Sequence, residues 1–158
     1  MRRIFSITAL LVVSAILLGC ESSGNPFAGS QWDVGIHHLS FSQVVAEWDT
    51  ANNRMILKFG LLSGSSYPNA EVVVDGVTTL TVNQPRDCDV TVAVSQGEEY
   101  ECIAGDADIN ATITFTRFDL GPLGAVSGQL TGIAQRIGVP SDPLVDLEGS
   151  FNDVIVTN

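Results

Sequence analysis

The sequence predicts an all-β domain: an antiparallel β-sandwich of about seven to nine strands, with a small closed β-barrel as the alternative. From about residue 40 onward, apolar and polar residues alternate in short runs, which is the pattern of half-buried strands. Gly, Pro, Asn and Asp separate these runs, as turn residues do in all-β proteins. No later stretch keeps a helical period, so the domain is expected to be built from strands.

The first nineteen residues are predicted to be a secretory signal peptide, the helix expected in the precursor. Arg2 and Arg3 form its charged end, residues 4–18 form its apolar stretch, and Gly19 is the small residue before the cut, as in exported proteins. The apolar stretch is shorter than the roughly 20 residues that a membrane-spanning helix needs. We therefore expect residues 1–19 to be cleaved.

The end of this signal, Leu17-Leu18-Gly19-Cys20, resembles the lipobox of bacterial lipoproteins. The resemblance implies cleavage before Cys20, a diacylglyceryl group on its thiol, and acylation, typically with palmitate, of the new N-terminus. The mature protein would then contact a membrane through these acyl chains. In many diderm bacteria an aspartate after the cysteine retains lipoproteins at the inner membrane, so Glu21 implies the outer membrane in such a source.

Loss of the signal makes the chain more acidic. The mature chain would hold 139 of the 158 residues, about one domain by length. Arg2 and Arg3 would be lost, so five of the seven basic residues would face eighteen acidic ones, and the formal net charge would move from −11 to −13. A surface of this charge repels phosphate backbones, which excludes nucleic acid as a partner.

Residues 20–31 are predicted to be a lipidated flexible tether, because they are rich in Ser, Gly, Pro and Asn. Residues 32–158 are predicted to be the single β domain. Its first hairpin joins residues 43–49 to residues 54–61. One register satisfies both the charges and the apolar face: Asp49 opposite Arg54, with Trp48, Ala46 and Val44 opposite Met55, Leu57 and Phe59.

Two further hairpins are predicted in the middle of the chain. Asp75-Gly76, between residues 71–74 and residues 77–82, is the strongest short hairpin signal. Residues 89–95 and 99–103 form the next hairpin, around a turn at Gly97. Pro85 is expected to interrupt strand pairing just before this hairpin.

Cys88 and Cys102 are predicted to form a disulfide bond. They remain after Cys20 is assigned to the lipid, and pairing is the usual state of cysteines in an exported chain. A turn centred on Gly97, however, does not place them opposite each other. Either the turn is shifted or the bond starts from a bend before the strand, and we favour the bend because Pro85 precedes it.

The last third predicts a three-strand meander over residues 111–118, 125–137 and 145–156. A bulge near Asn152-Asp153 would explain the change of phase in the final strand. Residues 124–132 and 145–151 are similar to a strand pair of small bacterial lipoproteins of unknown function, in which a Ser-Gly-x-apolar-x-Gly strand precedes a Gly-Ser-Phe strand. This resemblance implies a β-sandwich and carries no activity.

Asp106, Asp108 and Asn110 are weak metal candidates. Their alternating oxygen side chains resemble the start of calcium loops. Ala111 and Arg117 then stand where the EF-hand pattern needs a glycine and a bidentate glutamate. The alternative is the polar beginning of a strand, and no metal is predicted.

The chain shows no catalytic motif. It lacks a Gly-x-Ser-x-Gly sequence before a helix and a phosphate loop. Its two histidines, His37 and His38, are adjacent, so on an extended chain they point to opposite sides, and no third metal ligand follows at a diagnostic spacing. We predict that the protein is not an enzyme and carries no cofactor.

Two hypotheses of function follow. The leading one is a non-catalytic β-sandwich that acts as a binding or structural module at the cell envelope. The alternative is a carrier of a small apolar ligand, because Gly29 and Trp32 are similar to the Gly-x-Trp start of lipocalins, with one more residue between them. Trp32 also suits a core position in a first strand. A carrier needs an internal cavity of several hundred Å³.

Overall fold

The computed structural model describes residues 30–60, 66–77, 82–121 and 124–157, which form ten strands and no helix. The all-β prediction is confirmed, with more strands than expected, while the predicted signal helix and tether residues 1–29 lie outside the described residues. The strands are β1 (Ser30–Val34), β2 (His37–Phe41), β3 (Val44–Asp49), β4 (Arg54–Phe59), β5 (Asn69–Val74), β6 (Pro85–Ser95), β7 (Glu98–Cys102), β8 (Ala111–Phe118), β9 (Ala125–Arg136) and β10 (Val145–Thr157). Thus β1 begins two residues before the predicted start of the domain.

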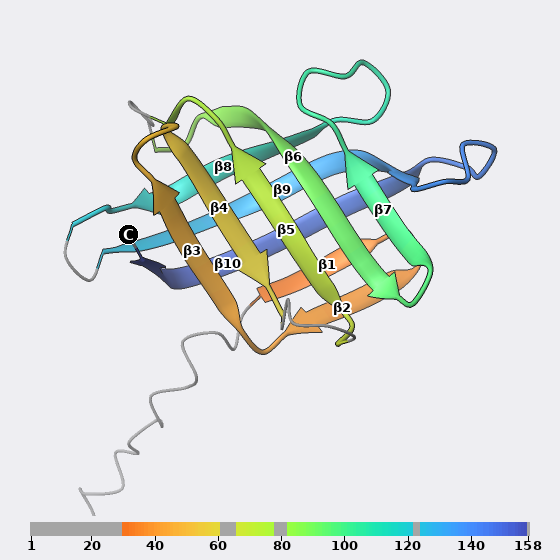
Figure 1. Cartoon of the computed structure of the whole chain (residues 1–158), viewed down its shortest axis with the longest axis horizontal. Coiled ribbons are helices and arrows are strands. Elements are labelled where there is room, and N and C mark those ends of the chain that lie inside the picture. Colours follow the sequence, from red (N-terminus) through yellow and green to blue (C-terminus); the bar gives the residue numbers. More distant parts are fainter. Residues whose placement is uncertain (1–29, 61–65, 78–81, 122–123, 158) are drawn as a thin grey trace, which may run out of the picture.

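The strands make one mixed sheet that folds into two crossing layers. Figure 1 shows β3, β4, β5, β6 and β7 in front, and β2, β1, β10, β9 and β8 behind. Long strands connect the layers, because β6 pairs with β5 and β7 in front and with β8 behind. At the other side, Val156 and Thr157 of β10 lie parallel to Ala46 and Glu47 of β3. The sheet therefore contains a parallel pair of strands, whereas the sequence predicts a purely antiparallel arrangement.

The predicted register of the first hairpin is confirmed. Asp49 lies opposite Arg54, and the apolar pairs follow as expected. The charges, however, make other contacts: Arg54 Nε donates to Asp75 Oδ1 at 2.6 Å, whereas Asp49 Oδ1 accepts the N–H of Ala51 at 3.0 Å. Asp49 therefore closes the turn, and Arg54 links β4 to the end of β5.

The predicted hairpin at Asp75-Gly76 is wrong. Strand β5 already has β4 on one edge and β6 on the other, so neither edge is left for residues 77–82. Gly76, at φ +69°, instead turns the chain so that the N–H of Val77 donates to the carbonyl of Asn53 at 3.0 Å. Val77 is buried there, and residues 78–81 lie outside the described residues.

The next hairpin is present, but Pro85 does not interrupt it. Strand β6 starts at Pro85 and turns into β7 through Gln96 and Gly97, with Gly97 at φ +78°, as tight hairpin turns require. The register places Val90 opposite Cys102.

Cys88 and Cys102 are free, buried thiols, so the predicted disulfide is not formed in the structure. Cys88 lies within β6, two residues from Val90, and the favoured bend before the strand is absent from this described stretch. It is therefore a diagonal neighbour of Cys102. Diagonal positions on paired strands are about 7–8 Å apart, beyond the usual Cα separation of about 4.4–6.8 Å for a disulfide.

The predicted meander is confirmed, since β8, β9 and β10 pair antiparallel in that order. The bulge is confirmed as well: the register of β10 shifts between Phe151 and Val154, and Asp153 has a φ of +49°. Phe151 and Val154 are three positions apart, so on a regular strand they would point to opposite faces. The bulge lets both face the interior.

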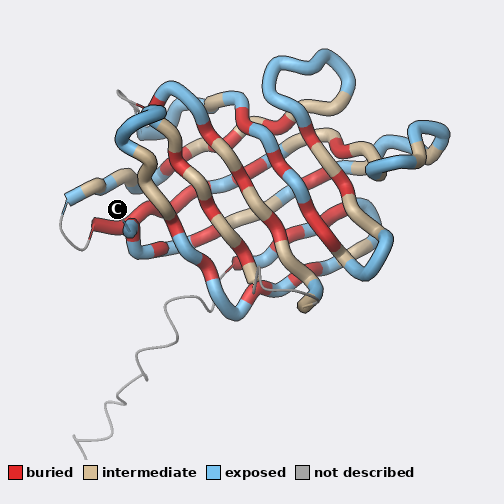
Figure 2. Tube along the Cα trace, in the orientation of Figure 1, coloured by how far each residue is buried: buried red, intermediate tan, exposed pale blue. Residues whose placement is uncertain are grey.

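Aromatic rings fill the space between the layers. The ring centroids of Trp32 and Phe59 are 4.6 Å apart, and those of Phe59 and Phe151 are 6.0 Å apart. Phe151 continues the chain of contacts to Phe115 at 6.0 Å. Figure 2 shows how buried positions alternate along the strands of both layers. The core position suggested for Trp32 is confirmed, with 2% of the residue exposed.

Candidate functional site

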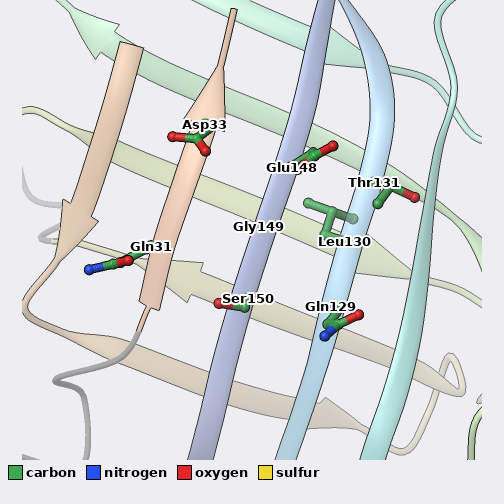
Figure 3. Close-up of a pocket in the computed structure, with 8 residues that line it drawn as sticks. All are labelled: Gln31, Asp33, Gln129, Leu130, Thr131, Glu148, Gly149 and Ser150. Atoms are coloured by element: carbon green, nitrogen blue, oxygen red, sulfur yellow. The ribbon is translucent and has the colours of Figure 1, made fainter.

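A shallow polar groove crosses the outer face of the rear layer. Six polar side chains on three neighbouring strands line it: Gln31 and Asp33 of β1, Glu148 and Ser150 of β10, and Gln129 and Thr131 of β9 (Figure 3). The strand register sets them in two rows, because Gln31, Ser150 and Gln129 lie opposite one another, as do Asp33, Glu148 and Thr131. Gly149 and the buried Leu130 line the space between the rows. The groove has a volume of about 340 Å³.

The two carboxylates of this groove do not form a catalytic pair. Asp33 and Glu148 lie opposite each other on β1 and β10, where like charges are destabilising. Figure 3 shows their side chains turned apart, Asp33 away from β10 and Glu148 toward Thr131. Asp33 Oδ1 lies 2.5 Å from Nδ1 of His38 on β2. The arrangement supplies hydrogen-bonding groups and negative charge rather than an acid and a base that face one reacting bond.

A second polar cluster joins the two layers where the β1–β2 and β6–β7 turns meet. His37 Nε2 lies 3.0 Å from Glu98 Oε1, and the Tyr100 hydroxyl donates to the same oxygen at 3.1 Å. Ser95 Oγ donates to Glu98 Oε2 at 3.1 Å. Burial raises the pKa of Glu98, but the hydrogen bonds from Tyr100 and Ser95 and the nearby His37 outweigh it and hold that pKa below its ordinary value. Glu98 is thus an ionised acceptor that connects the layers.

Arg136 extends this cluster to the β9–β10 loop. Its Nη2 donates to the carbonyl of Gly97 at 3.2 Å, and its Nη1 donates to Asp142 Oδ2 at 3.3 Å. Its Nε is buried without a hydrogen-bond partner. The guanidinium is therefore occupied in holding the loop against the β6–β7 turn.

A second hollow, of about 490 Å³, lies between the β7–β8 loop and the β9–β10 loop. Its lining is acidic and apolar: Asp106, Asp108, Ile109, Gln135, Pro140, Asp142, Pro143 and Leu144. Asp106 Oδ1 accepts the backbone N–H groups of Asp108 at 2.8 Å and of Ile109 at 3.0 Å, and these bonds lower the pKa of Asp106. The Asp106 carboxylate in this lining is therefore ionised at neutral pH.

The metal candidates from the sequence do not converge. Asp106 uses its carboxylate on the backbone of its own loop, and Asn110 Nδ2 donates to the carbonyl of Asp106 at 3.0 Å. The three residues lie in the β7–β8 loop, so they do not begin a strand either. Within the described ranges, no group of three or more His, Cys, Asp or Glu is placed to hold a metal ion. His37 and His38 contact different carboxylates, Glu98 and Asp33, as their alternation predicted.

Comparison of the chain with protein-family models, with curated proteins and with solved structures gave no match. In the part of the chain that the structure describes, no helix is long and apolar enough to cross a membrane. Nothing among the described residues or in the comparisons points to catalysis.

Sequence reasoning missed the cluster around Glu98 and the residues of the polar groove. Tyr100 and Arg136 come from strands far apart in the sequence that become neighbours because β7 pairs with β9. The signal available in the sequence was the alternation of polar with apolar residues on β9 and β10, which did not indicate that β1 would lie beside β10.

Proposed function

We propose that the protein is a lipid-anchored lipoprotein of the cell envelope whose β domain is a non-catalytic binding module. The lipobox at Leu17-Leu18-Gly19-Cys20 supports the anchor. Strand β1 begins at Ser30, ten residues after Cys20, and an extended chain of this length reaches about 35 Å at most. The domain would therefore sit close to the membrane that holds it, on the outer membrane if the source is a diderm bacterium.

The observation that best supports a binding role is that the hollows lie on the outside of the domain. The groove over β1, β10 and β9 and the hollow between the two loops both lie on the outside of the domain. Large buried side chains occupy the space between the layers, Trp32, Phe59, Phe115 and Phe151 among them. This packing supports a β-sandwich with a filled interior and an outward-facing binding surface over a carrier that encloses its ligand.

The carrier hypothesis and the binding module differ in their response to an apolar probe. If the interior is filled, the native protein will not enhance the fluorescence of 1-anilinonaphthalene-8-sulfonate in a saturable, one-to-one manner. A saturable increase that is lost on replacing Trp32 with a smaller residue would favour the carrier instead.

The anchor is tested by metabolic labelling of the expressed chain with an alkyne analogue of palmitate. The wild-type protein should incorporate the label, and Cys20→Ala should not. Ser22→Ala is the matched control, because it changes a neighbouring residue outside the lipobox and should keep the label. A second variant, in which an ordinary cleaved signal peptide replaces residues 1–20, should move from the membrane fraction to the soluble fraction. Label in Cys20→Ala, or membrane association of the second variant, would contradict the anchor.

A further inference from the structure

The hollow between the β7–β8 and β9–β10 loops lies away from the start of β1. Figure 1 shows both loops at the upper right, whereas β1 starts near the lower middle and runs toward the right. The β1–β2 turn reaches the same end, because the N–H of Gly35 donates to the carbonyl of Asp146, just after the β9–β10 loop, at 2.9 Å. If the chain is anchored through the residues before β1, this hollow lies away from the point of attachment.

Both loops are held in place by hydrogen bonds within the loop or to a neighbouring strand. In the β7–β8 loop, the N–H of Ile103 donates to the carbonyl of Ile109 at 2.6 Å, and the N–H of Ala104 donates to Asp89 Oδ1 at 2.8 Å. In the β9–β10 loop, Gln135 Nε2 donates to the carbonyl of Pro140 at 3.1 Å. A hollow whose walls are already ordered loses little conformational entropy when a ligand binds.

The surface of this hollow combines apolar contact with negative charge. Leu144 is 46% exposed, and Pro140 and Pro143 are exposed beside it. Asp106, Asp108 and Asp142 also line it, and the nearby Arg136 is turned to Asp142 and to the carbonyl of Gly97. The lining therefore keeps an excess of negative charge beside its apolar residues.

We propose that this hollow, the distal groove, binds an extended segment of another protein in which lysine or arginine residues flank an aliphatic side chain. The aliphatic side chain packs against Leu144 and the two prolines, where burying apolar surface stabilises the complex. The cationic groups lie at the carboxylates of Asp106 and Asp108, which complement their charge. The inference deepens the proposed function and rests on it, since it names the partner class of the binding module.

Asp108 and Leu144 are the residues to change. In the described contacts, the β7–β8 loop is held by Asp106 and Asn110 rather than by the Asp108 carboxylate, so Asp108→Asn removes a charge and leaves those bonds in place. Leu144→Gln removes apolar surface from an exposed position. Glu71→Gln is the matched control, because it removes one charge from β5. Strands β6 and β7 lie between β5 and Gln135 of the distal groove.

The test measures the fluorescence anisotropy of a labelled hexapeptide, Lys-Leu-Pro-Lys-Leu-Arg, titrated with the mature lipidated protein in phosphatidylcholine vesicles. Asp108→Asn should weaken binding about 2- to 5-fold, as expected for one exposed ion pair, and Leu144→Gln should weaken it about 5-fold through lost apolar contact. Glu71→Gln should change the dissociation constant by less than about 2-fold. A hexapeptide with serine in place of both leucines should bind more weakly than the parent.

Three results would overturn the proposal: no saturable binding to the wild-type protein, equal weakening by Asp108→Asn and Glu71→Gln, or equal binding of the serine peptide. Equal weakening would indicate a general attraction of cations to an acidic protein. A melting curve for each variant separates loss of the site from loss of the fold. Flotation of the same vesicles on a density gradient measures independently whether the protein is attached to the membrane. Loss of peptide binding and loss of membrane attachment are therefore distinguished.

Discussion

The contact between Trp32 and Gly149 gives the sharpest test of the filled interior. The two residues lie opposite each other on β1 and β10. A Cβ placed on Gly149 would lie 2.8 Å from Cε2 of the Trp32 ring and 2.9 Å from Cδ2 and Nε1. These separations are far below the roughly 3.5–4.0 Å of ordinary carbon contacts, and Trp32 is fixed between Phe41 and Phe59. Gly149→Ala must therefore displace the ring or the strand.

Overpacking of this kind costs about 1–3 kcal/mol of unfolding free energy. For a domain of this size each kcal/mol lowers the melting temperature by about 2–5 °C, so Gly149→Ala should melt roughly 2–15 °C below the wild type by circular dichroism. Gly121→Ala is the control, since its Cβ would meet only the Asp119 carboxylate, at 3.1 Å. Trp32→Phe should recover part of the loss in the double variant, because the contacted indole atoms are then absent or moved. Unchanged melting of Gly149→Ala, or a loss equal to that of the control, would refute the packing argument.

Two more predictions concern titratable groups. The pKa of Glu98 lies below its ordinary value in the folded state, so this residue contributes stability that is present above the unfolded pKa and is lost as the pH falls through the folded pKa. Glu98→Gln should therefore show a shallower fall in melting temperature than the wild type from about pH 5 to pH 3. An unchanged slope would contradict the stabilising role of the cluster around Glu98. Burial raises the pKa of Cys102 to about 12 and also raises the pKa of Cys88, so maleimide should label neither thiol of the native protein quickly at pH 7. Both should be labelled in urea without a reductant; unlabelled cysteines in urea would show that a disulfide forms after all.

The sequence predicts those parts of the fold that local patterns determine. The register of β3 and β4 follows from alternation over a short turn, in which Asp49 and Arg54 can be aligned by charge as well as by burial. The bulge at Asn152-Asp153 follows from a change in the phase of apolar residues within one strand. In each case the informative residues are a few positions apart, so the prediction does not depend on a long-range contact.

The errors arose where distant strands decide the outcome. Asp75-Gly76 has the composition of a hairpin turn, but β6 takes the edge of β5 that the second hairpin strand would have needed. Pro85 begins a strand because β8 pairs with this end of β6. The cluster around Glu98 depends on His37 from β2 in the other layer, and local alternation cannot specify such a contact.

The most direct test of the lipid anchor is the mass of the N-terminal peptide of the mature protein, measured after proteolysis of the membrane fraction. We predict a peptide that begins at Cys20 and carries a diacylglyceryl group on the thiol together with an acyl chain on the α-amino group. A peptide that begins at Met1, or one that contains Cys20 without lipid, would contradict the proposal of a lipid-anchored module.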